Sequence, residues 1–299
     1  MSEHEFLAAQ FEEQRGHLRA VAYRMLGSAS EADDAVQETW LRLSRSDSKA
    51  IENLGGWLTT VVARVCLDVL RSRASRREET LDEPSAPPTP TQHTRDPEQE
   101  AVLADSVGTA LLIVLNRLTP AERIAFVLHD SFGVSFEEIG SIIGRSPAAA
   151  RQLASRARRR VQGTDTTLSA DVRQQREVVN RFLTALRAGD YEGLIAVLDP
   201  DVVVHADATA VRTGAAREVR GATTWAKGAV AFSRLAQFVQ PMLVNGSVGL
   251  VFAPGGRLSR ALTFTIGHGK IVSAEIIADP ARLQELEVSV LEENGPAAL

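Results

Sequence analysis

The chain has 299 residues, of which 44 % are hydrophobic and 24 % charged, and its formal net charge is −5 at pH 7. These values are ordinary for soluble globular protein, and the length predicts two or three domains with cores of their own. The negative charge argues against a protein that coats nucleic acid by bulk attraction. There is no run of 18 apolar residues and no apolar signal-peptide core, so we expect no membrane partner and a cytoplasmic protein. The single cysteine, Cys66, fits a buried structural thiol better than a catalytic one.

Residues 1–77 predict an all-helical domain. The stretch "SEADDAVQETWLRL" places Val36, Trp40 and Leu43 on one helical face, and "GGWLTTVVARVCLDVLRSR" repeats such a pattern. Residues 78–97 are rich in proline, threonine and acids, with almost nothing to bury, and predict a disordered acidic linker. The sequences on either side of this linker are therefore expected to form separate domains.

Residues 98–163 predict a second helical domain that ends in a helix-turn-helix. A capping-box pattern at Ser135 starts the first helix of this motif, and Gly144 fits a left-handed stop. Ser146 and Pro147 then begin a longer second helix.

Residues 170–283 differ from the helical regions before them, because they contain strand-like runs. A helix is followed by strand-like runs, "DVVVHAD", "MLVNGSVGLVFA" and "RLSRALTFTIGHGKIVSAEIIA", which are separated by glycine and asparagine turns. This order predicts an α+β domain with a curved antiparallel sheet. Residues 284–299 are polar and predict a frayed tail.

Two compact basic patches interrupt the acidic chain. Residues 64–77 hold five arginines and one aspartate, and residues 145–160 hold six arginines and no acid. Arginine suits both phosphate and guanine contacts, so these patches can bind DNA locally. The alternative for the second patch is a solvated helix whose cations favour the C-terminal end of the helix dipole. The capped helix and tight turn that precede it favour DNA recognition.

The chain resembles bacterial RNA polymerase sigma factors of the extracytoplasmic-function (ECF) class. The resemblance lies in "AYRMLGSASEADDAVQETWLRL", "WLTTVVARVCLDVLRSRASRRE" and "LTPAERIAFVLHDSFGVSFEEIGSIIGRSPAAARQLASRARRRV". It covers residues 5–77 as region 2 and residues 98–163 as region 4. Further on, "FLTALRAGDYEGLIAVLDPDVVVHAD" and "GHGKIVSAEIIADPARLQEL" are similar to the SnoaL-like domain fused to one subgroup. The implied fold is a region 2 bundle, a region 4 helix-turn-helix and a cone-shaped α+β SnoaL-like barrel.

The resemblance implies a sigma factor that binds core RNA polymerase, recognises the −10 and −35 promoter elements and initiates transcription. It implies no enzyme activity, no metal and no cofactor. The implied partners are the β′ clamp helices and the β flap of the polymerase, promoter DNA and, within the chain, a contact between the C-terminal domain and the sigma domains. In the fused subgroup, the C-terminal domain regulates the sigma factor in cis.

The resemblance also implies roles for individual residues. The implied polymerase-binding residues are Asp34, Gln37, Glu38 and Trp40, although Trp40 fits the core equally well. The implied −10 contacts are Arg64, Asp68, Arg71 and Arg73, after a loop, roughly residues 44–56, that would hold a flipped base. The implied −35 contacts are Arg145, Ser146, Arg151, Gln152, Ser155, Arg156, Arg158 and Arg159.

The C-terminal domain offers a candidate pocket. His205 and Asp207 lie two residues apart on a predicted strand and so share one face, and Trp225 fits a pocket lining or the core. A His–Asp pair can act as general acid and base, but a structural or ligand-binding role is more frequent. Two other functions therefore stay open: a SnoaL-like small-molecule enzyme with a vestigial sigma module, and a one-component DNA-binding repressor that senses a small ligand.

Overall fold

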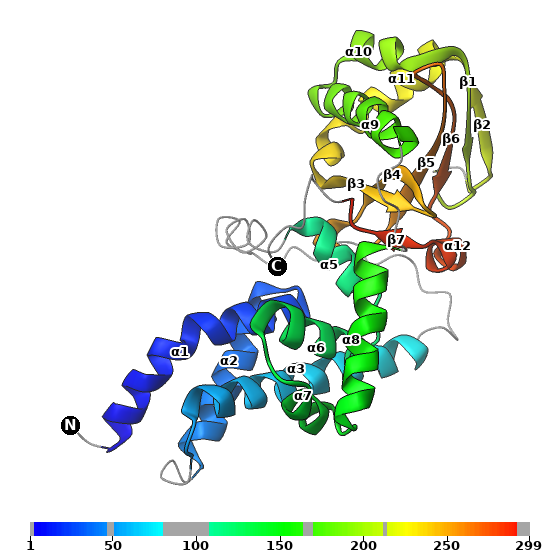
Figure 1. Cartoon of the computed structure of the whole chain (residues 1–299). Coiled ribbons are helices and arrows are strands. Elements are labelled where there is room, and N and C mark those ends of the chain that lie inside the picture. The colour runs from blue at the N-terminus through cyan, green and yellow to red at the C-terminus, as the bar shows by residue number, and fades with distance from the viewer. Residues whose placement is uncertain (1–2, 47–50, 80–107, 164–169, 212–213, 292–299) are drawn as a thin grey trace. The chain divides into compact units, whose positions relative to one another are not determined.

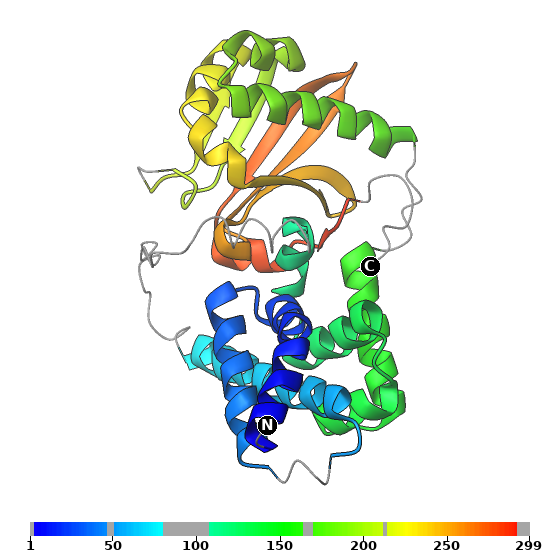
Figure 2. The same cartoon turned by 90° about the vertical axis from the view of Figure 1, so that its left-hand side faces the viewer.

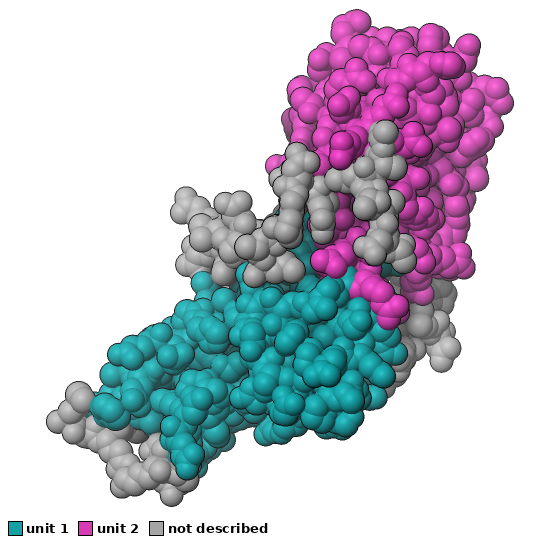
Figure 3. All heavy atoms as spheres, in the orientation of Figure 1, with its two compact units in different colours: residues 1–158, 299 teal, residues 159–298 magenta. Residues whose placement is uncertain are grey.

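The computed structural model describes residues 3–46, 51–79, 108–163, 170–211 and 214–291 (Figure 1). The chain divides into two compact units, residues 1–158 and residues 159–298 (Figure 3). Both predicted helical domains thus contribute to the first unit, instead of forming two units of their own. All but the first two residues of the predicted linker lie outside the described residues. Along the described ranges, no helix is both long and apolar enough to cross a membrane.

The first unit is built from helices, as predicted. They are α1 (Glu3–Leu26), α2 (Ala29–Ser44), α3 (Leu54–Glu79), α5 (Thr109–Leu115), α6 (Pro120–Phe126), the π-helix η3 (Val127–Ser131), α7 (Phe136–Ile143) and α8 (Pro147–Gln162), within which the unit ends. Helices α1, α2 and α3 pack on one another and bury the predicted apolar stripes, including Val36 and Leu43. Cys66 is buried in α3, and burial raises the pKa of its thiol to about 12. The prediction of a buried thiol is confirmed.

A buried arginine joins the N-terminal helices of the first unit to its later helices. Arg123 in α6 is 2 % exposed. Its Nη1 donates to Asn116 Oδ1 at 2.6 Å, and its Nε and Nη2 donate to the carbonyl oxygen of Arg24 at 3.4 and 3.2 Å. Burial lowers the pKa of Arg123 to about 9, so the guanidinium is still charged at neutral pH. The carbonyl it meets lies in the last turn of α1, where the helix dipole favours a cation.

Aromatic contacts surround this junction. The rings of His17 in α1 and Phe132 meet edge to face with their centres 5.3 Å apart. The guanidinium carbon of Arg24 lies 5.1 Å from the centre of the same Phe132 ring. Helix α3 also packs against α6 and α7. The helices of regions 2 and 4 therefore share one compact unit.

The second unit is an α+β domain. Its elements are α9 (Ala170–Ala188), α10 (Tyr191–Val197), β1 (Leu198–Ala206), β2 (Arg217–Arg220), α11 (Ala222–Val230), the 3₁₀-helix η4 (Ser233–Phe238), β3 (Val239–Val244), β4 (Ser247–Phe252), the 3₁₀-helix η5 (Pro254–Gly256), β5 (Arg260–Gly267), β6 (Lys270–Ile277), α12 (Pro280–Glu285) and β7 (Val288–Ser289). The sheet has the order β2-β1-β6-β5-β4-β3-β7. Helices α9 and α11 lie over one face of it (Figure 2), and their buried side chains form the core with that face. This is the α+β architecture that the SnoaL-like resemblance implied.

The sheet was predicted to be antiparallel, but it is mixed, with one parallel pair of strands. Strands β1 and β6 pair in parallel, because the chain passes through β2, α11 and the β3–β4–β5 meander before β6 returns beside β1. The other pairs are antiparallel. Two of them close through two-residue turns, Asn245-Gly246 and His268-Gly269, in which every residue has positive φ. Such turns match the right-handed twist of hairpin strands, and they confirm the predicted glycine and asparagine turns between strands.

The frayed tail was predicted to begin at residue 284, which is too early in the chain. Residues 284–291 are described and include the end of α12 and strand β7, which pairs with β3. Asn245 holds this segment, because its backbone N–H donates to the carbonyl of Glu287 at 2.8 Å and its Oδ1 accepts from the Glu287 N–H at 2.8 Å. Polar composition alone did not reveal these hydrogen bonds.

The Arg123 junction predicts a specific stability effect. Arg123→Met removes three hydrogen bonds and leaves the Arg24 carbonyl and the Asn116 side chain without this donor, so we expect a loss of about 2–3 kcal/mol. Native-state hydrogen exchange of peptides from α3 and α6 measures the opening free energy of the first unit. The control is Arg42→Met, which removes an exposed ion pair with Glu38 and should cost less than about 0.5 kcal/mol. Equal losses in the two variants would contradict the assignment of Arg123 as the junction.

Candidate nucleic-acid interface

Helices α7 and α8 form the predicted helix-turn-helix. Ser135 Oγ accepts from the Glu138 N–H at 3.3 Å and Glu138 Oε2 accepts from the Ser135 N–H at 3.2 Å, which completes the capping box of α7. Gly144 ends this helix in the left-handed conformation, with φ of 71°. Ser146 Oγ then accepts from the Ala149 N–H at 3.2 Å and caps α8. The predicted caps, stop and second helix are confirmed.

Gly140 is a structural requirement of the motif that the sequence reasoning missed. A Cβ atom at this position would lie 2.7 Å from the carbonyl oxygen of Arg145 and 3.3 Å from the nitrogen of Pro147. Only glycine lets the turn fold back this closely on α7. The signal was a glycine inside an otherwise good helix, which usually has a packing reason.

Helix α8 divides into a buried and a basic face. The predicted inward stripe, Ala150, Leu153, Ala157 and Val161, is buried. Most of the predicted −35 residues are exposed: Arg145, Ser146, Arg151, Gln152, Ser155, Arg156 and Arg159. This exposed set contains four arginines and no acid, so α8 offers cations and an amide to a phosphate backbone and to base edges.

Three arginines of α8 contact other parts of the first unit. The guanidinium carbon of Arg151 lies 5.2 Å from the centre of the Phe136 ring in α7. Arg156 Nε is 3.9 Å from the buried Glu122 carboxylate, while its side chain remains 55 % exposed. Arg158, by contrast, forms a short ion pair with Asp130 of η3. Arg158 therefore differs from the other predicted −35 residues.

The predicted −10 residues separate into two groups. Arg64, Asp68 and Arg71 are exposed on α3, and Arg64 Nη2 donates to Ser141 Oγ of α7 at 3.4 Å. Arg73 instead donates from Nη1 to the carbonyl of Leu26 at 3.2 Å and forms an ion pair with Glu31. These contacts tie α3 to the end of α1 and the start of α2. Arg73 therefore has a structural partner that the resemblance did not reveal.

The predicted polymerase-binding face lies on α2. Asp34 and Gln37 are exposed, and the half-exposed Glu38 accepts from Arg42 Nε at 2.9 Å, one helical turn later. Such an exposed pair contributes little to stability and leaves both groups accessible to a partner. This face of α2 thus carries two carboxylates and an amide at the surface.

Apolar side chains accompany these acids. The half-buried Trp40 ring lies 5.1 Å from the buried Phe11 ring, so Trp40 packs on the core with part of its surface and leaves the rest accessible. The next residue, Leu41, is 39 % exposed, and Phe6 in α1 is 51 % exposed. Leu41 was missed from the sequence because it falls outside the apolar stripe. Single exposed apolar residues are normal on a protein surface, so Leu41 and Phe6 do not by themselves define a binding face.

The three candidate pocket residues of the C-terminal domain are not brought together. His205 lies on the outer side of β1, where its Nδ1 is 3.6 Å from the Glu218 carboxylate and its side chain is 58 % exposed. Trp225 is buried on the opposite side of the sheet and stacks on Phe182 at 5.2 Å. Alternation along β1 explains the separation, because the buried neighbour Val204 faces the core and His205 faces away from it.

Asp207 is held by the backbone. Its Oδ1 accepts from the Ala210 N–H at 2.8 Å, and its Oδ2 accepts from the N–H groups of Ala278 and Asp279 at 2.7 and 2.9 Å. Burial raises the pKa of this carboxyl, but the three hydrogen bonds outweigh it and the pKa is lowered overall. Asp207 therefore braces the end of β1 against the turn after β6 and is poorly suited to accept a proton at neutral pH.

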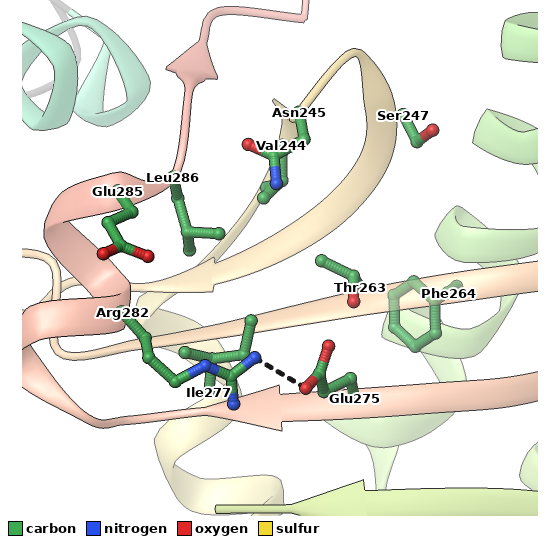
Figure 4. A pocket seen from close by; sticks show the side chains of 10 residues that line it. All are labelled: Val244, Asn245, Ser247, Thr263, Phe264, Glu275, Ile277, Arg282, Glu285 and Leu286. Carbon is green, nitrogen blue, oxygen red and sulfur yellow. Dashed lines mark hydrogen bonds and ion pairs between the residues drawn. The ribbon is translucent and has the colours of Figure 1, made fainter.

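A cavity of about 470 Å³ lies elsewhere in this domain (Figure 4). Its lining includes Thr263, Glu275 and Arg282, and Arg282 Nη2 donates to Glu275 Oε1 at 2.7 Å. None of the three candidate pocket residues lines it. Among the described residues, no three His, Cys, Asp or Glu side chains group to hold a metal.

Comparisons with known proteins match both helical regions. The family described as "Sigma-70 region 2" matches residues 11–76, and "Sigma-70, region 4" matches residues 109–161. The first segment contains α2 and most of α3, and the second contains α5, α6, α7 and nearly all of α8. The boundaries that the resemblance gave for regions 2 and 4 are close to these ranges.

Relatives align along nearly the whole length of the chain. The chain is 39 % identical over 286 residues to the ECF RNA polymerase sigma factor SigJ of Mycobacterium tuberculosis, covering 91 % of each chain. It is 34 % identical over 296 residues to the probable ECF RNA polymerase sigma factor SigI of the same organism, covering 97 % of this chain and 99 % of SigI. The crystal structure of the Mycobacterium tuberculosis SigJ protein matches at 35 % identity with a TM-score of 0.44, covering 92 % of this chain and 97 % of SigJ. On this similarity along nearly its full length, the chain belongs to the ECF RNA polymerase sigma factors.

Proposed function

We propose that this chain reads promoter DNA with α8 at the −35 element and with the exposed face of α3 at the −10 element, while the acidic face of α2 docks on the β′ clamp helices of core polymerase. As an ECF sigma factor, the chain is a promoter-specificity subunit of RNA polymerase. Its place of action is therefore the cytoplasm, where that polymerase works. The observation that carries the DNA-binding proposal is the capped α7–α8 motif, in which the predicted −35 residues of the turn and α8 expose four arginines and no acid.

The chemistry of the exposed side chains supports base reading by α8 and backbone contacts by α3. Arginine makes bidentate contacts to guanine and clamps phosphates, and glutamine pairs with adenine, so Arg151, Gln152 and Arg156 can read bases. Arg64 and Arg71 on α3 can hold the backbone of an opened strand. Sigma factors are not enzymes, and we assign no reaction to the C-terminal domain, since Asp207 is occupied by backbone donors.

Promoter binding requires the first unit to open. By their names, the −10 and −35 elements lie about 25 base pairs apart, which is roughly 85 Å of B-DNA at about 3.4 Å per base pair. In the first unit, however, Arg64 of α3 touches Ser141 of α7. The two reading helices cannot reach both elements from this arrangement. We therefore include in the proposal that binding to core polymerase separates α3 from the α6–α8 segment.

The C-terminal domain is proposed to regulate the sigma factor in cis. The similarity to SigJ and SigI extends over nearly the full chain, so the second unit accompanies the sigma regions in these relatives as well. A domain that is covalently attached acts at a high effective concentration on its own sigma regions. This supports regulation within the chain without a separate partner.

Transcription with purified core polymerase tests the main proposal. On templates enriched from a random DNA pool by the reconstituted holoenzyme, the chain should start transcription from defined positions. The double variant Arg156→Glu, Arg159→Glu should reduce open-complex formation at least tenfold, because each swap places a carboxylate against the phosphates. Arg173→Glu, an exposed arginine on α9, is the matched charge control and should leave initiation unchanged. If neither the full chain nor a chain ending at residue 163 supports initiation at a defined position, the chain does not have the proposed function.

Removal of the second unit tests regulation in cis. A chain ending at residue 163 keeps α1–α8 and should differ from the full chain in transcripts formed per bound polymerase. Core-polymerase affinity and far-UV circular dichroism, measured on both chains, show whether the shortened chain is folded. Identical transcription by the two folded chains would rule out a regulatory role in this assay.

A further inference from the structure

The ion pair with Asp130 distinguishes Arg158 from the other arginines of the basic helix α8. Arg158 donates from Nε and Nη2 to the same oxygen, Asp130 Oδ1, at 2.7 and 2.5 Å. The Asp130 side chain is only 9 % exposed, whereas the Arg158 side chain is 41 % exposed. The second carboxylate oxygen, Oδ2, is buried and has no hydrogen-bond partner in the described part of the chain. This carboxylate thus relies on Arg158 for its side-chain hydrogen bonds.

Asp130 lies at a structural irregularity. It belongs to the five-residue π-helix η3, which continues α6 and precedes the capped start of α7. Two of its neighbours in η3, Val127 and Leu128, are buried, so the backbone that carries Asp130 is anchored in the core of the first unit. Single π-helical turns of this kind occur frequently at functional sites.

The ion pair fixes one end of α8. At the other end, the helix is held by the Ser146 cap and by Arg151 over the Phe136 ring. Between these two attachments, Ala150, Leu153, Ala154 and Ala157 of the inward face are buried, and Arg156 lies 3.9 Å from the buried Glu122 carboxylate. The Arg158–Asp130 pair adds a polar attachment near the C-terminal end of α8, the helix that also carries Gln152 and Ser155.

We infer that Arg158 is a positioning residue, which holds the recognition helix α8 at the rotation needed for base reading through Asp130, and is not itself a phosphate or base contact. The inference rests on the proposed −35 function of α8. It changes the role that the resemblance implied for Arg158 and adds Asp130, which carries no DNA-binding chemistry of its own.

A cycle of variants separates this role from a direct DNA contact. In full-length chain bound to core polymerase, the dissociation constant is measured for a duplex enriched by the holoenzyme and for the same duplex with a scrambled −35 element, over a series of salt concentrations. If Arg158 positions α8, then Arg158→Ala and Asp130→Ala each reduce the preference for the enriched duplex roughly tenfold, and the double variant is no worse than either. The salt dependence stays unchanged, because no phosphate contact is lost. Arg158→Lys restores part of the preference, since an ammonium can still reach Oδ1.

Arg159→Ala is the matched control, because Arg159 is exposed and has no side-chain partner among the described residues. As a phosphate contact, it should weaken binding to both duplexes and reduce the salt slope by about 0.9. The inference fails if Arg158→Ala behaves in this way, or if Asp130→Ala keeps or increases affinity by releasing the arginine to the DNA. Unchanged affinity for core polymerase shows that each variant is folded. If the unmodified holoenzyme shows no preference for any duplex, the proposed function fails, and that outcome is distinct from failure of this inference.

Discussion

The buried guanidinium of Arg123 is the contact on which the first unit depends. It bridges a helix of region 4 to the last turn of α1 in region 2, and it does so almost without access to water. A buried cation costs several kcal/mol unless its donors are satisfied, and here carbonyl and amide oxygens satisfy them. The contact consists of three hydrogen bonds, which water or a partner can replace when the unit opens. This makes it suited to a junction that must both hold and open.

The closed unit keeps α3 packed against α6 and α7, whereas the proposed reading of both promoter elements requires α3 to separate from them. Helix α3 carries the proposed −10 contacts, and helices α6 and α7 pack against it. Helix α8 nevertheless keeps its basic face exposed in this arrangement. The region 4 motif is thus complete before DNA arrives, since its caps, its glycine stop and its ion pair with η3 are internal to it. In the proposed opening, binding to polymerase changes the separation of the two regions and not their internal structure.

Local features of the sequence predicted local structure well. The Ser135 capping box, the Gly144 stop and the apolar stripe of α8 depend on residues close in sequence, and all three are confirmed. Contacts between distant residues were missed, such as Arg123 with Arg24, 99 residues apart, and Arg158 with Asp130, 28 apart. An arginine on a basic helix looks the same in sequence whether it faces DNA or an aspartate. For the same reason, the parallel pairing of β1 with β6 and the opposite directions of His205 and Trp225 could not be read from strand-like runs alone.

The separation of α3 and α7 in solution tests the account most directly. Probes attached to cysteines at Ser75 on α3 and Glu137 on α7, both exposed, report this distance, and the buried Cys66 thiol, whose pKa is about 12, will react slowly with the labelling reagent. We predict a short distance in the free chain and an increase to roughly 85 Å when the chain is bound to core polymerase and promoter DNA, the span of about 25 base pairs. An unchanged short distance in a complex that initiates transcription would contradict it.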